Sequence, residues 1–250
     1  MLLNKILGIK KGDIVSIVGS GGKTTLMYLL AKELSECAKV LTTTTTKIYL
    51  PTKKKVDFIA VGEENFNNVR NNSSYGIYSY GKYINEENKL IGIEKEKIKN
   101  YINNFDYIII ESDGSKRKPI KGWNDKEPVI YDETSITIGI ISLESFEMII
   151  NDENVHRVDK FIELTKSSLG KKININHFTK VIFNGNGLFR GSKGGRILFL
   201  NKLEKINEEN LNLLIDEISK INNECKLLNK IVVGSLKNRK YEVINKFINS

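Results

Sequence analysis

The stretch Val18-Gly19-Ser20-Gly21-Gly22-Lys23-Thr24-Thr25 decides how the rest of this 250-residue chain is interpreted. An apolar run over residues 14–18 precedes the glycines, and a run with leucines at helical spacing over residues 24–36 follows them. Glycines let the backbone curl so that several N–H groups point at one anion, and the start of a following helix adds partial positive charge. Strand, glycine-rich turn, Lys-Thr and helix together predict a phosphate-binding loop.

The loop departs from the standard pattern G-x-x-x-x-G-K-[ST], because the expected first glycine falls on Ile17. The shorter variant G-x-x-G-K-T-T is similar to the loop of the Mur-type peptidoglycan ligases and their relatives. We expect Lys23 to supply a full positive charge and the Thr24 hydroxyl to hold Mg²⁺. A glycine-rich turn with a solvated lysine is the alternative, which the flanking strand and helix disfavour. The predicted nucleotide-binding residues of the loop are Gly19, Ser20, Gly21, Gly22, Lys23, Thr24 and Thr25.

A second predicted strand, residues 39–43, runs directly into a threonine-rich segment. In a right-handed β-α-β unit this strand is expected beside the first one. Ligands collect at the carboxyl ends of parallel strands, so Thr44, Thr45 and Lys47 are candidates for contacting a second ligand. Threonines also suit a strand and its exit turn, and both interpretations stay open.

The apolar run from Phe105 to Ile110 predicts a central parallel strand that is covered on both faces. It ends in Glu111, and Asp113 follows two residues later. In P-loop nucleotide hydrolases such a strand delivers a carboxylate to Mg²⁺ or to the attacking water. Glu111 is therefore the expected metal ligand together with Thr24, and Asp113 is expected to orient a nucleophile. Lys23, Glu111 and Asp113 are the predicted catalytic residues.

The remaining pattern predicts one α/β domain over residues 1–250, with three layers and a mostly parallel central sheet. Residues 53–93 are less regular and predict a small inserted β element. Within that segment we expect strands at 57–61 and 75–80, an Asn-rich connection at 65–74, and a hairpin completed by 83–93. Further on we expect a helix at 94–103, a strand at 135–142, a strand at 197–200, a helix at 208–225 and a strand at 230–235.

The charge, the cysteines and the apolar runs of the sequence bear on which partners and which compartment we expect. The net charge is +9, but the basic residues are scattered and no aromatic-basic RNA motif is visible, so a nucleic-acid partner is disfavoured. We expect no signal peptide, because the apolar stretch at residues 1–9 is short and soon turns polar. The sequence has no apolar run of membrane-spanning length, and its two cysteines lack metal-like spacing. A cytoplasmic protein without a membrane partner is expected.

Three further segments carry possible ligand contacts. The basic run at Lys116 and Arg117 suits either a second anionic ligand or a solvated loop. His156 precedes Arg157, and a lone histidine is more often structural than catalytic. Asn201-Lys202-Leu203-Glu204 resembles the Asn-Lys-x-Asp motif with which GTPases read guanine. Glu204 stands where that motif has Asp, so guanine specificity is doubtful, but Asn201 and Lys202 are expected to pack on a nucleotide base.

The motifs occur in a recognisable order: VGSGGKTTL, VLTTTTTKIYLP, IIIESDGSKRKPIKG with EPVI, VHR, GLFRG and LFLNKLE. This set resembles the YqeC family, described as selenium-dependent hydroxylase accessory proteins. The resemblance covers almost the whole chain and is weakest over residues 53–104. Ser112 and Val158 depart from the family pattern, and neither change removes a charged group.

The resemblance implies a P-loop NTPase-like fold and a role in maturing selenium-dependent molybdenum hydroxylases. It also implies which residues form the nucleotide loop, the acidic strand end and the VHR element. The residues implied or considered for a second ligand are Thr44, Thr45, Lys47, Lys116, Arg117, His156 and Arg157.

We therefore expect a protein that binds ATP (or GTP) with Mg²⁺ and acts as an NTPase or ATP-using enzyme. The alternative is a non-enzymatic carrier or chaperone that binds a nucleotide-bearing molybdenum cofactor and hands it to a selenium-dependent hydroxylase. A GTPase, suggested by Asn201 and Lys202, is the weaker alternative.

Overall fold

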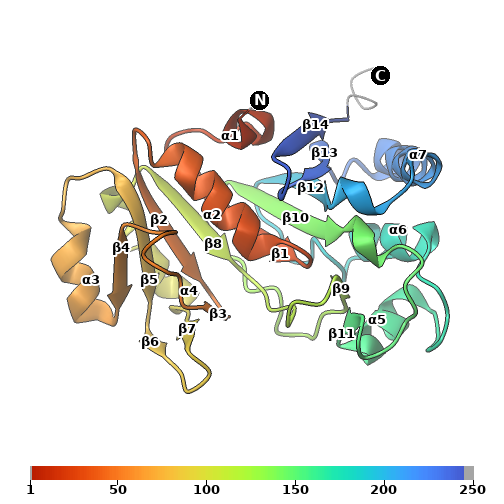
Figure 1. The fold of residues 1–250 in the computed structure, drawn as a ribbon, viewed down its shortest axis with the longest axis horizontal. Coiled ribbons are helices and arrows are strands. Elements are labelled where there is room, and N and C mark those ends of the chain that lie inside the picture. Colours follow the sequence, from red (N-terminus) through yellow and green to blue (C-terminus); the bar gives the residue numbers. More distant parts are fainter. Residues whose placement is uncertain (1, 245–250) are drawn as a thin grey trace.

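The computed structural model describes residues 2–244 and forms an α/β fold around a nine-stranded sheet (Figure 1). All neighbouring strands are parallel except β14, which runs antiparallel to β13 at one edge. In spatial order the strands are β14 (Lys240–Val243), β13 (Lys230–Ser235), β12 (Gly195–Asn201), β10 (Ile136–Ser142), β1 (Ile14–Gly19), β8 (Tyr107–Glu111), β2 (Lys39–Thr44), β5 (Gly76–Gly81) and β4 (Phe58–Val61).

Helices cover both faces of this sheet and make three layers. On one face, α1 (Leu3–Leu7) and α2 (Lys23–Leu34) pack against alternate residues of β1 such as Val15 and Ile17. On the other face, α3 (Glu63–Arg70) and α4 (Lys95–Ile98) cover one half of the sheet. The other half is covered by α5 (Val158–Thr165), α6 (Ile175–Phe183) and α7 (Glu208–Cys225). The expected three-layer architecture with a mostly parallel sheet is confirmed.

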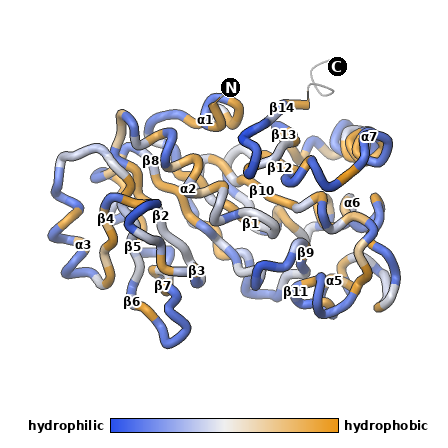
Figure 2. Tube along the Cα trace, in the orientation of Figure 1, coloured by the Kyte–Doolittle hydropathy of each residue, from blue (hydrophilic) through white to orange (hydrophobic). Residues whose placement is uncertain are grey.

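Burial explains why the central strands read as continuous apolar runs. Every residue of β1 is buried, as are the last four of β8 and the last six of β10, because both faces of these strands are covered. Figure 2 shows hydrophobic colour along the central strands and hydrophilic colour in the loops around β9 and in the turn between β6 and β7. None of the helices within residues 2–244 is both long and apolar enough to span a bilayer.

One sequence-based expectation about strand order is wrong. β2 does not lie beside β1, because β8 is inserted between them and pairs with both. The β1–α2–β2 crossover therefore passes over one strand. Strands that are apolar along their whole length bury the most apolar surface at the centre of the sheet, which favours a central position for β8. The acidic end of β8 therefore lies directly next to the glycine-rich loop.

The segment from 53 to 93 contributes to two different sheets. β4 and β5 extend the central sheet, whereas β6 (Tyr83–Ile84) and β7 (Lys89–Ile91) form a hairpin that pairs with β3 (Lys47–Tyr49). The expected hairpin and small β element are thus confirmed. The Asn-rich stretch expected as a connection instead forms most of α3, because Phe66 is fully buried against Tyr80 and Tyr101.

A second small sheet pairs β9 (Ile120–Lys121) with β11 (Val155–His156) in parallel. Figure 1 shows both small sheets on the side of the central sheet where β1 and β8 end. The expected helix at 94–103 is reduced to α4 and a 3₁₀ turn, η1 (Ile102–Asn104). Two further 3₁₀ turns are η2 (Leu143–Ser145) and η3 (Leu203–Lys205).

Candidate functional site

The glycine-rich loop connects the end of β1 to the start of α2. Its glycines at 19, 21 and 22 have φ values of +100°, +80° and +147°, a region that residues with a side chain rarely adopt. A Cβ atom on Gly19 would lie 2.2 Å from the Ile140 carbonyl oxygen, and one on Gly21 would lie 2.3 Å from the Ser142 Cβ. The loop is therefore glycine-rich both for its backbone conformation and for its close packing on the end of β10.

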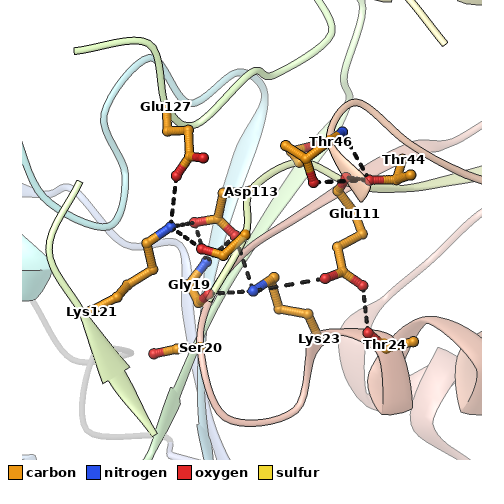
Figure 3. Close-up of polar contacts among 12 residues, drawn as sticks. Gly19, Ser20, Lys23, Thr24, Thr44, Thr46, Glu111, Asp113, Lys121 and Glu127 are labelled. Carbon is orange, nitrogen blue, oxygen red and sulfur yellow. Dashed lines mark hydrogen bonds and ion pairs between the residues drawn. The ribbon is translucent and has the colours of Figure 1, made fainter. Parts of the chain in front are cut away.

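Lys23 lies inside the loop with only 3% of its surface exposed. Its Nζ donates to the Gly19 carbonyl oxygen at 2.5 Å and lies 3.2 Å from Asp113 Oδ1 and 3.8 Å from Glu111 Oε1 (Figure 3). The structure thus brings together all three predicted catalytic residues. A buried ammonium needs such partners, since an unpaired charge is costly to remove from water.

Glu111 is hydrogen-bonded to Thr24 of the glycine-rich loop. Thr24 Oγ1 donates to Glu111 Oε2 at 2.7 Å. Burial raises the pKa of the Glu111 carboxyl, and Lys23 and Thr24 offset this only in part. Thr44 Oγ1 donates to the Glu111 backbone oxygen at 2.7 Å and so fixes the end of β8.

Asp113 is held more tightly than Glu111. Its carboxylate accepts from the Gly19 N–H at 3.1 and 3.0 Å, from Lys121 Nζ at 3.0 Å and from Trp123 Nε1 at 2.9 Å. Burial alone would raise the pKa of Asp113, but Lys23, Lys121 and the Gly19 N–H outweigh it and hold that pKa below its usual value. The two neighbouring carboxyl groups are therefore shifted in opposite directions.

A line of buried charges continues outward from Asp113. Lys121 is fully buried and pairs with Glu127 at 3.0 Å. Glu127 in turn accepts two hydrogen bonds from the Arg157 guanidinium, at 2.5 and 2.9 Å. We call Lys23, Asp113, Lys121, Glu127 and Arg157 the ion chain, in which the sign of charge alternates at each step.

Lys121, Trp123 and Glu127 belong to this site, although the sequence alone did not predict them as site residues. The available signal was the position of Lys121 between apolar residues in Pro119-Ile120-Lys121-Gly122-Trp123. A lysine flanked by apolar residues is a candidate for burial, and a buried lysine needs an acidic partner. Nothing in the local sequence says that the partners are Asp113 and Glu127.

The residues of the threonine-rich segment after β2 have two different surroundings. Thr44 reaches Glu111, and Thr45 Oγ1 donates to the Val129 carbonyl oxygen at 2.9 Å, so both brace the backbone around the acidic strand end. Lys47 lies on the small β3–β7–β6 sheet, where its half-exposed ammonium pairs with Glu87 at 3.0 Å. The contacts of Lys47 lie on that sheet and not at the glycine-rich loop.

The other candidates surround the loop. Ser20 Oγ donates to the Pro119 carbonyl oxygen at 3.0 Å, and Thr25 is exposed on the first turn of α2. Arg117 lies over the Tyr49 ring at 4.1 Å, with Lys116 exposed beside it. His156 is buried on β11, and burial together with the charges of Arg157 and Lys121 lowers its pKa to about 4.

Asn201 and Lys202 lie at the end of β12. Asn201 Nδ2 donates to the Gly21 carbonyl oxygen at 2.8 Å, and Asn201 Oδ1 accepts from the Leu236 N–H at 3.1 Å. Both ends of this amide are thus used to hold the glycine-rich loop against the last parallel strand. Lys202 has a left-handed backbone and pairs with Glu144.

The donors around the loop limit how a metal could bind. Among residues 2–244, no group of three or more His, Cys, Asp or Glu side chains is arranged to hold a metal ion. Thr24 and Glu111 could supply two oxygen ligands, and Mg²⁺ commonly takes one or two protein ligands and completes its shell with substrate phosphates and water. The donor set therefore fits Mg²⁺ in the presence of a polyphosphate.

Comparison with known proteins agrees with this arrangement of motifs. The family model described as YqeC protein matches residues 15–159, which is more than half of the chain. A protein of Escherichia coli (strain K12), described as "Uncharacterized protein YqeC", is 25% identical over 201 residues, covering 78% of each chain. No solved structure gives a significant match. The chain therefore belongs to the YqeC family.

Proposed function

We propose that this protein binds ATP with Mg²⁺ at the glycine-rich loop and uses it in maturing selenium-dependent molybdenum hydroxylases. One observation carries the first part: Lys23 and Thr24 of the loop both lie against Glu111 at the end of the neighbouring strand. Catalysis of phosphoryl transfer depends mainly on positioning and on neutralising charge, and these are the groups that such a site requires. The role in hydroxylase maturation rests on what the family resemblance implies.

Lys23 has two sets of partners available. Without nucleotide its ammonium satisfies the Gly19 carbonyl oxygen and Asp113. A polyphosphate cradled by the loop amides would offer a stronger, doubly charged partner, and Lys23 would turn towards it. Asp113 would keep Lys121, Trp123 and the Gly19 N–H, so its burial would remain compensated after Lys23 leaves.

The Thr24–Glu111 pair fits the Mg²⁺ position. Octahedral Mg²⁺ binds oxygen at about 2.1 Å, which places adjacent ligand oxygens about 3 Å apart. Thr24 Oγ1 and Glu111 Oε2 lie 2.7 Å apart, so a cation can replace the hydrogen bond between them after a small outward shift. The raised pKa of Glu111 would fall when the cation arrives, because positive charge favours the carboxylate.

The two carboxylates take different roles in this proposal. Asp113 accepts hydrogen bonds from the Gly19 N–H, Lys121 and Trp123, and it keeps all three after Lys23 turns to the phosphates, whereas the side chain of Glu111 accepts only from Thr24. We therefore assign Glu111 to the cation and treat Asp113 as the residue that positions Lys121 and the loop. This proposal differs from the sequence-based hypothesis that Asp113 orients a nucleophile, which stays a prediction.

ATP is favoured over GTP by the contacts of Asn201. Guanine recognition by an Asn-Lys-x-Asp motif needs a free asparagine amide, whereas both ends of the Asn201 amide are engaged with backbone. The carrier alternative uses the same loop, in which Lys23 would hold the phosphates of a nucleotide-bearing molybdenum cofactor without turnover.

The first experiment measures ATP binding to the purified protein by calorimetry, with and without Mg²⁺. Lys23→Ala is expected to weaken binding at least a hundredfold, because it removes the charge that faces the phosphates. Lys32→Ala, an exposed lysine of the same helix, is the matched control and should bind like the wild type. Equal affinity of Lys23→Ala and the wild type would refute the nucleotide site.

A second experiment separates enzyme from carrier by phosphate release from ATP and from GTP. Release that needs Mg²⁺ and disappears in Glu111→Gln supports the enzyme, since the amide keeps the shape but loses the charge that holds the cation. Tight binding without release, also in the presence of a selenium-dependent hydroxylase, supports the carrier. Preference for GTP over ATP would contradict the assignment of Asn201.

A further inference from the structure

The two histidines of the chain have different surroundings. The His177 ring bonds Asn174 through Nδ1 at 2.6 Å and Ser167 through Nε2 at 2.9 Å, and it completes the N-terminal cap of α6. The His156 ring, only 7% exposed as a residue, has no hydrogen bond to any residue within the described range 2–244. Helix capping explains His177, whereas no contact of this kind explains His156.

The pairing of β9 with β11 sets the direction of His156. His156 lies directly opposite Lys121 in this parallel ladder. Opposed residues of neighbouring parallel strands point to the same face, and such strands lie about 4.8 Å apart. Lys121 Nζ reaches Asp113 at 3.0 Å, so the His156 side chain lies on the face directed towards Asp113 and the glycine-rich loop.

Residues 115–119, which we call the basic strap, lie next to the same face. The strap is fixed at three points, so its position does not depend on a ligand. The fixing contacts are Ser20 Oγ to the Pro119 oxygen at 3.0 Å, Lys118 Nζ to the Val155 oxygen at 3.2 Å, and the Arg117 guanidinium to the Tyr49 ring at 4.1 Å. Lys116 lies between these points, and no hydrogen bond or ion pair of its side chain is found within residues 2–244.

The backbone of these basic residues is held in an unfavourable conformation. Lys116, Arg117 and Arg157 have φ values of 47°, 63° and 55°, in the left-handed region that costs about 1 kcal/mol or more for residues with a side chain. The charges of Arg157, Lys121 and Lys116 disfavour protonation of the His156 ring, and Glu127, which pairs with Arg157 and Lys121, offsets part of this effect. The imidazole is therefore neutral in a field that attracts an anion.

We propose that His156, Lys116 and Arg157 form a second anion site, which holds a carboxylate or phosphate group of a second ligand beside the nucleotide. The His156 ring donates a hydrogen bond to the anion and Lys116 supplies positive charge, while Arg157 keeps its two bonds to Glu127 and donates one of its remaining N–H groups. The site deepens the proposed function, on which its role beside a nucleotide rests. Ser20 of the glycine-rich loop donates to Pro119 of the basic strap, so the segment that carries Lys116 is attached directly to the loop that would hold the nucleotide.

The test uses the full chain labelled with ¹⁵N-histidine and saturated with Mg²⁺ and a non-hydrolysable ATP analogue, which fills the glycine-rich loop. Inorganic phosphate is titrated in one arm and acetate in the other, and the ring signals of both histidines are followed by NMR. We expect the His156 signals to shift saturably and the His156 pKa to rise, because a nearby anion stabilises the imidazolium. The His177 signals should stay fixed. Saturation by phosphate alone assigns a phosphate group, and saturation by acetate as well assigns a carboxylate.

Two lysine variants make the test specific. Lys116→Ala should weaken anion binding about tenfold, as expected for loss of one charged contact. Lys226→Ala is the matched control, because Lys226 is also an exposed lysine with a left-handed backbone, at the end of α7. His156 signals that ignore both anions, or equal anion affinity in Lys116→Ala and the wild type, would overturn the second site.

The same experiment distinguishes the two proposals. If the ATP analogue does not bind, the nucleotide proposal fails, and the titration is repeated on nucleotide-free Lys23→Ala protein. A saturable His156 shift there still supports the second anion site, and its absence overturns it.

Discussion

The two small sheets lie at the same edge of the central sheet but are attached to it by different kinds of charge contact (Figure 1). The β9–β11 ladder is joined to the glycine-rich loop by the ion chain, in which the side chains of Asp113 and Lys121 are fully buried. The β3–β7–β6 sheet carries ion pairs such as Lys47–Glu87, whose side chains are 52% and 56% exposed. Exposed pairs contribute about 0–1 kcal/mol each, whereas breaking a buried pair costs several kcal/mol.

This difference indicates which small sheet belongs to the site. The β9–β11 ladder cannot move without separating buried charges, so its residues are coupled to the state of Lys23 through Asp113. Replacing the surface charges of the β3–β7–β6 sheet should have little effect on the structure of the glycine-rich loop. The predictions below test that contrast, from the largest expected effect to the smallest.

Lys121→Met should give the largest loss of stability. The methionine fits a buried position but leaves Asp113 and Glu127 without the ammonium that pairs with both. We expect the free energy of unfolding, measured by urea denaturation, to fall by about 3–5 kcal/mol. Lys47→Met is the control on the other small sheet and should cost less than about 1 kcal/mol. Equal losses in the two variants would remove the contrast.

Glu127→Gln should have a smaller effect on stability than Lys121→Met. The amide keeps the shape but loses the charge that faces Lys121 and Arg157, and Arg157 can still turn towards water. We expect a loss of about 1–3 kcal/mol at neutral pH, measured in the same way. Burial raises the pKa of Glu127, but Arg157 and Lys121 outweigh this effect and hold its pKa in the folded protein below the usual value. The ionised Glu127 therefore stabilises the fold at pH values above the usual carboxyl pKa. This stabilisation is lost as the pH falls through the pKa of Glu127 in the folded protein. The variant and the wild type should therefore converge in stability in acid, and a constant difference down to pH 2 would contradict this assignment.

Glu111→Gln should raise the stability of the nucleotide-free protein slightly. Burial raises the pKa of Glu111 in the folded state, so its ionisation costs stability as pH rises through that value. The uncharged amide avoids this cost, and we expect a gain below about 1 kcal/mol at pH 8 that disappears in acid. Thermal unfolding across pH measures it. A large loss of stability at pH 8 would mean that Glu111 is a structural partner of Lys23 and not a group kept for a cation.

Glu87→Gln should leave stability unchanged. Lys89 and Lys47 lower the pKa of Glu87 to about 2, but Glu87 and Lys47 are exposed and Lys89 is only partly buried, so water and salt screen these charges. The urea midpoint of this variant should match the wild type within error. A clear decrease would show that the second small sheet is also held by its charges.

The sequence was sufficient for the parts of the fold that depend on local pattern. The loop at 19–25, the apolar strand before Glu111 and the helix at 208–225 each carry a regular signal, and the structure has them at those positions. The order β1-β8-β2 could not be read in the same way, because pairing between distant strands depends on which strands bury most apolar surface.

The ion chain could not be predicted from the sequence either, because it also depends on contacts between separate segments. Lys121 and Glu127 are close in sequence to Asp113. Their side chains form ion pairs only because of the turn through residues 114–119 and the pairing of β9 with β11. Arg157, about thirty residues further along, joins them through the start of α5. Phe66 is a similar case, because its burial turns a polar stretch into α3.

The most direct test of the account is a crystal structure of the protein with Mg²⁺ and a non-hydrolysable ATP analogue. It should show the phosphates against the amides of residues 19–25 and the cation between Thr24 and Glu111. Lys23 Nζ should have left the Gly19 carbonyl oxygen for a phosphate oxygen, while Asp113 keeps Lys121 and Trp123. A bound nucleotide elsewhere, with Lys23 still on Gly19 and Asp113, would contradict the account.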